Sequence, residues 1–193
     1  MTKKKKLISV YDMCEMAIFT ALAIVLGMFC EIKVGANGGS IGFAMVPLFF
    51  IAYRHGAIKG FICGGIIYGL AQGLYDGYIF QYGAISAFFD YIIPFGAIGL
   101  AGLFRKFIFT DEGDGVVHSA DPYIYIILSV TLVFVIRYLS HVVSGTLAYD
   151  TPWAGSFAYN ITYIAPTYFI DLIILLVLYY PLARLNKIYP VMR

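Results

Sequence analysis

The run PYIYIILSVTLVFVIRYLSHVVSGTLA, residues 122–148, decides the fold class because it is longer than a lipid bilayer is thick. A transmembrane helix needs about 20 mostly apolar residues, and this run exceeds that length. Its only charged or imidazole side chains are Arg137 and His141. Polar and apolar residues do not alternate along it, so the pattern favours a helix over a strand.

The rest of the chain repeats this pattern. The 193-residue sequence is 61% hydrophobic and only 12% charged, whereas soluble domains are about 25% charged. At about 20 residues per span, this length leaves no room for a soluble domain. We therefore predict an all-α integral membrane protein with six transmembrane helices in a single domain, residues 1–193. The predicted spans cover approximately 11–30, 42–56, 57–76, 82–104, 122–148 and 158–184.

The basic residues predict the orientation. Lys and Arg concentrate in cytoplasmic loops of membrane proteins. If both termini are cytoplasmic, all but two of the 13 Lys and Arg residues lie inside, the exceptions being Lys33 and Arg137. The basic run Lys3–Lys6 precedes the first span without a small-residue cleavage site, so we interpret that span as retained rather than as a signal peptide. We predict that both termini are cytoplasmic.

Ionisable side chains inside the spans are the candidate functional residues, because they are costly in lipid and usually mark a site. These are Asp90, Arg137, His141 and Asp171, with Asn160 at the outer start of the sixth span. At a rise of about 1.5 Å per residue, Asp90 and His141 lie at similar depths in the outer half of the membrane. Arg137 and His141 are four residues apart and share a helix face. Gly145 continues that face and leaves space beside the backbone.

Each of these residues also has a structural interpretation. Arg137 and Asp171 have similar depths, so a buried ion pair that sets helix register is an alternative to a ligand contact by Arg137. For Asp90 and His141 a ligand pocket is the favoured interpretation, and a hydrogen bond that is only structural is the alternative.

Aromatic residues surround the predicted outer layer. Tyrosine and tryptophan are enriched at every membrane interface, so an aromatic belt explains part of this pattern. An aromatic cleft that holds a carboxylate and an imidazole also suits a flat, cationic heteroaromatic ligand. The residues concerned are Tyr78, Tyr82, Tyr91, Tyr149, Trp153 and Tyr159.

Two ladders of small residues indicate close helix packing. Gly65, Gly69 and Gly73 recur every four residues in the third span, and Ala17 and Ala21 do so in the first. Such ladders let helix backbones approach within one protein. The alanine pair is also compatible with a groove for the helix of a partner.

Other chemistry is not indicated. The sequence has no G-x-x-x-x-G-K-[ST] phosphate-binding loop, no H-E-x-x-H and no paired C-x-x-C, so we predict neither ATP hydrolysis nor a metal site. An intramembrane acid–base enzyme that uses His141 with Asp90 remains an alternative, as does a structural membrane subunit without a small ligand.

Five segments, in order and within the six-span frame, resemble one family. These segments are AIFTALAIVLG (17–27), GGSIGFAMVPLFFIAYRHGAIKG (38–60), FFDY (88–91), IRYLSHVVSG (136–145) and AYNITYIAPTY (158–168). The chain resembles the thiamine-specific substrate-binding S components, the ThiT type, of energy-coupling-factor (ECF) transporters. The resemblance implies a multi-pass protein of the bacterial plasma membrane that binds thiamine and is not an enzyme. Another heterocyclic vitamin or precursor is the alternative ligand.

The resemblance also assigns roles to residues. It implies that Asp90 accepts hydrogen bonds from the aminopyrimidine of thiamine, that Tyr91 and His141 line the pocket, and that Arg137 lies near the hydroxyethyl or phosphate end. Gly145, Tyr159 and Asn160 match lining positions. Relatives often carry several pocket tryptophans, whereas this chain has only Trp153.

The resemblance further implies partners and a moving loop. Ala17 and Ala21 match the surface that docks on the transmembrane coupling subunit, and two separate ATPase subunits bind ATP. The chain itself needs no cofactor, and no nucleic acid is implied. The glycine-rich segment EIKVGANGGSI (31–41) is expected to close over the ligand.

Overall fold

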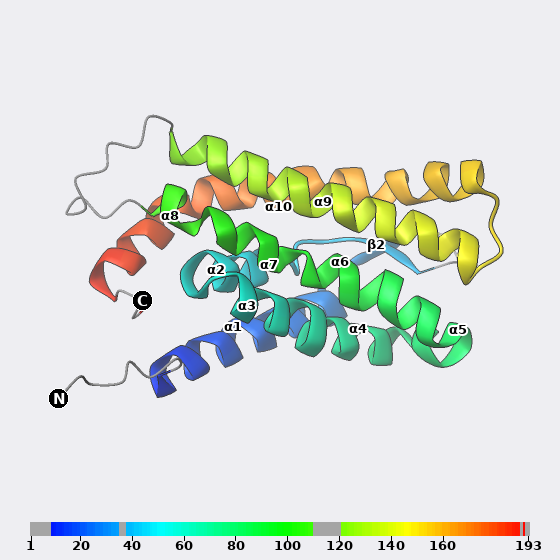
Figure 1. The fold of residues 1–193 in the computed structure, drawn as a ribbon, viewed down its shortest axis with the longest axis horizontal. Coiled ribbons are helices and arrows are strands. Elements are labelled where there is room, and N and C mark those ends of the chain that lie inside the picture. Colours follow the sequence, from blue (N-terminus) through cyan, green and yellow to red (C-terminus); the bar gives the residue numbers. More distant parts are fainter. Residues whose placement is uncertain (1–8, 35–37, 110–120, 190, 192–193) are drawn as a thin grey trace.

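The structure is a bundle of long helices with one short hairpin (Figure 1). This computed structural model describes residues 9–34, 38–109, 121–189 and 191. The basic residues Lys3–Lys6 and Arg193, on which part of the predicted orientation rests, lie outside the described residues. In chain order the elements are α1 (Val10–Phe29), β1 (Ile32–Val34), β2 (Gly39–Ile41), α2 (Val46–His55), α3 (Ala57–Phe61), η1 (Ile62–Tyr68), α4 (Gly69–Asp76), α5 (Tyr78–Ser86), η2 (Ala87–Ile92), α6 (Ile93–Gly96), α7 (Ile98–Ala101), η3 (Gly102–Phe104), α8 (Arg105–Ile108), α9 (Pro122–Leu147) and α10 (Trp153–Ile188).

Five helical stretches of the described chain are long and apolar enough to cross a membrane, which confirms the predicted helical membrane fold. They are Val10–Phe29, Ala57–Asp76, Tyr78–Ile108, Pro122–Leu147 and Trp153–Ile188. The beginning of α1 and the end of α10 lie at one end of the bundle. The α4–α5 and α9–α10 connections lie at the other end, here called the hairpin end, toward which β1 and β2 extend (Figure 1).

The segment predicted at 42–56 forms α2, which has ten residues and is buried along nearly its whole length. Pro47 occupies the first turn of α2, where its missing N–H costs no hydrogen bond. Gly56 ends the helix with a φ of 90°, a conformation that favours glycine, and the chain turns directly into α3. This helix therefore forms part of the protein core.

Glycines in the third predicted span bring two helices into close contact, as the ladder predicted. A Cβ added at Gly65 would lie 2.8 Å from the Cα of Gly96, and one at Gly69 would lie 2.8 Å from the carbonyl oxygen of Tyr91. Real side chains do not fit at these distances. The η1–α4 stretch is thereby held against η2 and α6, which carry the candidate residues Asp90 and Tyr91.

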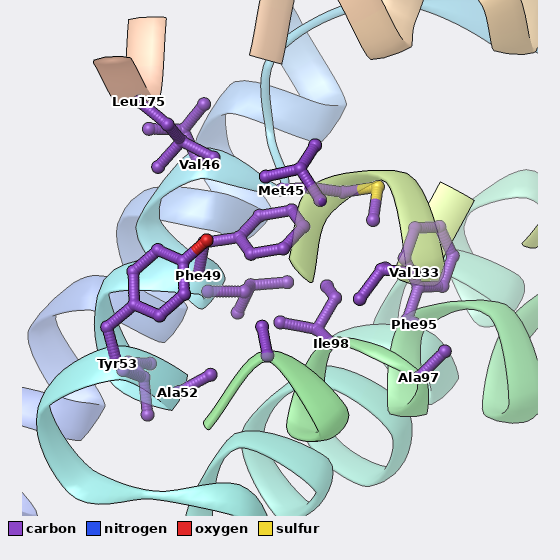
Figure 2. Close-up of a cluster of buried hydrophobic side chains, with 14 of the residues drawn as sticks. Met45, Val46, Phe49, Ala52, Tyr53, Phe95, Ala97, Ile98, Val133 and Leu175 are labelled. Atoms are coloured by element: carbon purple, nitrogen blue, oxygen red, sulfur yellow. The ribbon is translucent and has the colours of Figure 1, made fainter. Parts of the chain in front are cut away.

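A dense apolar cluster fills the middle of the bundle, where α2, α6, α7, α9 and α10 meet (Figure 2). Within it the hydroxyls of Tyr53 and Ser129 form a hydrogen bond, with oxygens 2.8 Å apart. Burial of this many apolar side chains fixes how the surrounding helices pack. The labelled members are Met45, Val46, Phe49, Ala52, Tyr53, Phe95, Ala97, Ile98, Val133 and Leu175.

Candidate ligand-binding site

A cavity of about 290 Å³ lies toward the hairpin end. Of the residues predicted for the pocket and its aromatic cleft, all line it except Tyr82 and Trp153, and the Trp153 side chain is half exposed. Segments far apart in the sequence therefore converge on one site. The lining residues are Glu31, Gly38, Ser40, Gln72, Asp76, Tyr78, Asp90, Tyr91, Phe95, Arg137, His141, Gly145, Tyr149, Thr151, Ser156, Tyr159, Asn160 and Tyr163.

Asp90 is the centre of the polar network. Its Oδ2 accepts hydrogen bonds from the hydroxyls of Ser86 at 2.8 Å, Ser144 at 2.7 Å and Tyr149 at 3.3 Å. Asp90 lies in the π-helical segment η2, and such widened turns are frequent at functional sites. Donors from α5, from α9 and from the α9–α10 connection thus hold one buried carboxylate at the cavity wall.

His141 completes this network from α9. Its Nδ1 lies 3.1 Å from Oδ1 of Asp90. An ionised carboxylate only accepts, so Nδ1 carries the proton and the neutral ring leaves Nε2 as an acceptor. Nε2 is buried and has no hydrogen-bond partner within the described part of the chain. It is therefore available to a donor on a ligand in the cavity.

Arg137 lies on α9, one helical turn from His141 and farther from the hairpin end, and is almost fully buried. Its Nη1 donates to the sulfur of Met45 at 2.6 Å, and its guanidinium lies 5.3 Å from the Phe95 ring centre and 5.6 Å from that of Phe134. Nε has no partner among the described residues, and the same holds for both carboxylate oxygens of Asp171. The alternative of a direct Arg137–Asp171 ion pair is therefore not realised here, and Arg137 faces the cavity.

The α9–α10 side of the cavity depends on a small residue. Asn160 donates through Nδ2 to the carbonyl and hydroxyl oxygens of Ser156, and it accepts a hydrogen bond from the Tyr163 hydroxyl. A Cβ at Gly145 would collide with the Ser156 hydroxyl. Glycine thus lets α9 approach the part of α10 that carries the pocket amide.

Tyrosine rings form the rim of the cavity. The ring centres of Tyr82 and Tyr149 are 4.0 Å apart, and Tyr78 lies 6.1 Å from Tyr82 and 6.3 Å from Tyr149. The two longer separations are typical of interacting aromatic pairs. Tyr78 and Tyr149 therefore present ring surface to the cavity, and Tyr82 packs against both of them.

The segment predicted as a glycine-rich loop contains an antiparallel hairpin, in which Lys33 of β1 lies opposite Ser40 of β2. The Tyr159 hydroxyl donates to the carbonyl oxygen of Val34 at 3.0 Å and lies 3.3 Å from the backbone nitrogen of Gly39. The hairpin is thereby fastened to α10 at the cavity.

Two carboxylates of the cavity, Glu31 and Asp76, were absent from the predicted site. The Ser40 hydroxyl donates to Glu31 at 2.5 Å, and burial raises the pKa of the Glu31 carboxyl. The Lys33 ammonium lies 3.0 Å from Asp76. Burial alone would lower the pKa of Lys33, but its hydrogen bond to Asp76 and the charges of both carboxylates outweigh burial and raise it.

Comparison with known proteins identifies the family. The sequence pattern of the thiamine transporter protein family (Thia_YuaJ) matches residues 13–187. The thiamine transporter ThiT of Bacillus subtilis is 32% identical, over 97% of this chain and 98% of its own length. The solved structure of ThiT from Listeria monocytogenes has a TM-score of 0.66 at 23% identity, covering 94% of this chain and 96% of that one, which shows a shared fold. The chain belongs to the thiamine transporter family, whose members are transporters and not enzymes.

Proposed function

We propose that this protein is the vitamin-binding S component of an ECF-type importer and that it captures thiamine from outside the cell. The observation that carries this proposal is the Asp90–His141 pair at the wall of the cavity, in a chain of the thiamine transporter family. The cavity of about 290 Å³ is close to the lower end of the range for small-molecule pockets.

The polar groups of the cavity are complementary to an aminopyrimidine linked to a cationic ring. Asp90 accepts from an exocyclic amine, while Nε2 of His141 accepts from a further N–H or O–H group. Arg137 offers an unused donor to the oxygen of a hydroxyethyl or phosphate group. The tyrosine rim provides ring faces for stacking, which also attract a positive charge.

Energy for transport comes from a separate ECF module in this proposal. The sequence contains no phosphate-binding loop, and a dense apolar cluster fills the middle of the bundle (Figure 2). The ligand therefore leaves by reorientation of the whole subunit against its coupling partner. Ala17 and Ala21 are exposed on α1, which supports their proposed role as the docking surface.

The first test is a calorimetric titration of the purified protein in detergent with thiamine, thiamine monophosphate, riboflavin, biotin and pyridoxine. We expect stoichiometric binding of thiamine that exceeds the affinity for the other vitamins at least tenfold. Preferred binding of a different heterocycle would select the alternative S-component specificity. Folded protein that binds none of these compounds would refute the proposal.

The second test addresses coupling. Ala17→Trp is expected to abolish thiamine uptake by cells that contain the ECF module, because an indole cannot enter a small-residue groove. Binding by the isolated protein is expected to remain unchanged. Leu22→Trp, at an exposed position on another face of α1, is the matched control and is expected to preserve uptake. Normal uptake by the Ala17 variant would remove the docking assignment.

A further inference from the structure

Besides Asp90, the cavity contains a second cluster of charged side chains, formed by two carboxylates and one lysine. Glu31 and Asp76 both line the cavity, and their side chains are 11% and 10% exposed. Lys33, on β1, does not line the cavity but contacts both carboxylates. Its Nζ is 3.0 Å from Asp76 and 3.9 Å from Glu31. The Lys33 side chain is 48% exposed. A single half-exposed cation therefore connects two nearly buried carboxylates.

Both carboxylates are held in place by groups other than Lys33. The Ser40 hydroxyl donates to Glu31, and the amide of Gln72 donates to Oδ2 of Asp76 at 3.1 Å. The Tyr91 hydroxyl lies 3.5 Å from the same oxygen of Asp76. The two carboxylates thus keep their positions when the lysine leaves, which is the property expected of a preorganised subsite.

The charges around the cavity are unequal. Three carboxylates line it, those of Glu31, Asp76 and Asp90, and Arg137 is the one Lys or Arg side chain in that lining. With Lys33 included and His141 neutral, one negative charge remains uncompensated. Independently, Arg137 lines the same cavity, and its buried Nε has no partner within the described residues. Both observations indicate a ligand that carries a positive charge and a hydrogen-bond acceptor.

We propose that Glu31 and Asp76 form a subsite for the positive charge of the ligand, and that the Lys33 ammonium occupies this subsite when no ligand is bound. A cationic ring entering the cavity then displaces the lysine into solvent. Displacement costs little, because half-exposed ion pairs are weak. The attraction between the ligand's positive charge and the same two carboxylates is stronger than that of Lys33, because the ligand meets them in a less polar environment. This inference rests on the proposed function, since it assumes a cationic heteroaromatic ligand.

The test compares thiamine binding by wild-type protein and Lys33→Met in calorimetry. The variant lacks the competing cation, so we expect binding about fivefold tighter, the ratio that a weak exposed ion pair represents. Lys33→Arg keeps the charge and is the matched control, with an expected affinity within about twofold of wild type. Because Lys33 is half exposed, neither substitution disturbs the packing of the bundle.

A second variant examines the carboxylates. Asp76→Asn is expected to weaken thiamine binding roughly tenfold or more, since it removes a charge at an effective dielectric of about 20. The melting temperature of Asp76→Asn shows whether weaker binding is caused by misfolding. If it is, the affinity of Lys33→Met relative to wild type alone tests the inference. If wild-type protein binds thiamine but Lys33→Met binds it no more tightly, this inference is overturned while the proposed function stands. If wild-type protein binds none of the vitamins, the proposed function fails first.

Discussion

Replacement of Asp90 by Asn is the sharpest perturbation of the pocket, because it preserves the shape of the side chain and removes its charge. The carboxylate accepts from Ser86, Ser144 and Tyr149 and faces Nδ1 of His141. In the variant, one of the two oxygens becomes an NH₂ group that cannot accept. The ligand amine and the serine hydroxyls then compete for the single remaining oxygen.

The expected loss follows from the hydrogen bonds involved. A hydrogen bond to a charged group contributes about 1.5–3 kcal/mol, and about 1.4 kcal/mol corresponds to a tenfold change in affinity. Asp90→Asn should therefore weaken thiamine binding roughly 10- to 100-fold. The serine hydroxyls can rotate toward other acceptors, so we expect the folded protein to lose only about 1–2 kcal/mol of stability.

Isothermal titration calorimetry is the appropriate assay for Asp90→Asn. The sole tryptophan, Trp153, does not line the cavity, so its fluorescence is a poor reporter of binding. Ser86→Ala is the matched control, because it removes one donor to Asp90 but retains the charge; its affinity should change by less than about fivefold. If folded Asp90→Asn binds thiamine as tightly as wild type, the carboxylate does not receive a hydrogen bond from the ligand and the site assignment is wrong.

Two further substitutions test the surroundings of the pocket. Tyr159→Phe removes the hydroxyl that links α10 to Val34 and Gly39 of the hairpin; we expect thiamine to dissociate several-fold faster in stopped-flow competition, and an unchanged rate would show that this link does not retain the ligand. Asp171→Asn is expected not to lower the melting temperature in detergent, because neither carboxylate oxygen has a partner in the described structure. A drop of several degrees would show that this carboxylate acts as a necessary counter-charge for Arg137.

Local periodicity explains why much of the pocket was predictable. Arg137 and His141 had to share a face because they are four residues apart on one helix, and both line the cavity. Chain depth placed Asp90 in the same layer, and it faces His141. The hydrophobic runs likewise predicted the long helices, because apolar length in a bilayer is a property of each segment alone.

The amino-acid sequence by itself therefore determined the membrane class, the long helices and the polar layer. Only the tertiary structure decided that α2 is short and buried, that Trp153 lies outside the cavity, and that Glu31 and Asp76 lie within it. Lys33 and Asp76 are 43 residues apart in the chain, and no local pattern couples them. Periodicity defines which residues share one helix face, whereas the faces that meet are chosen by glycine contacts and core packing between distant segments.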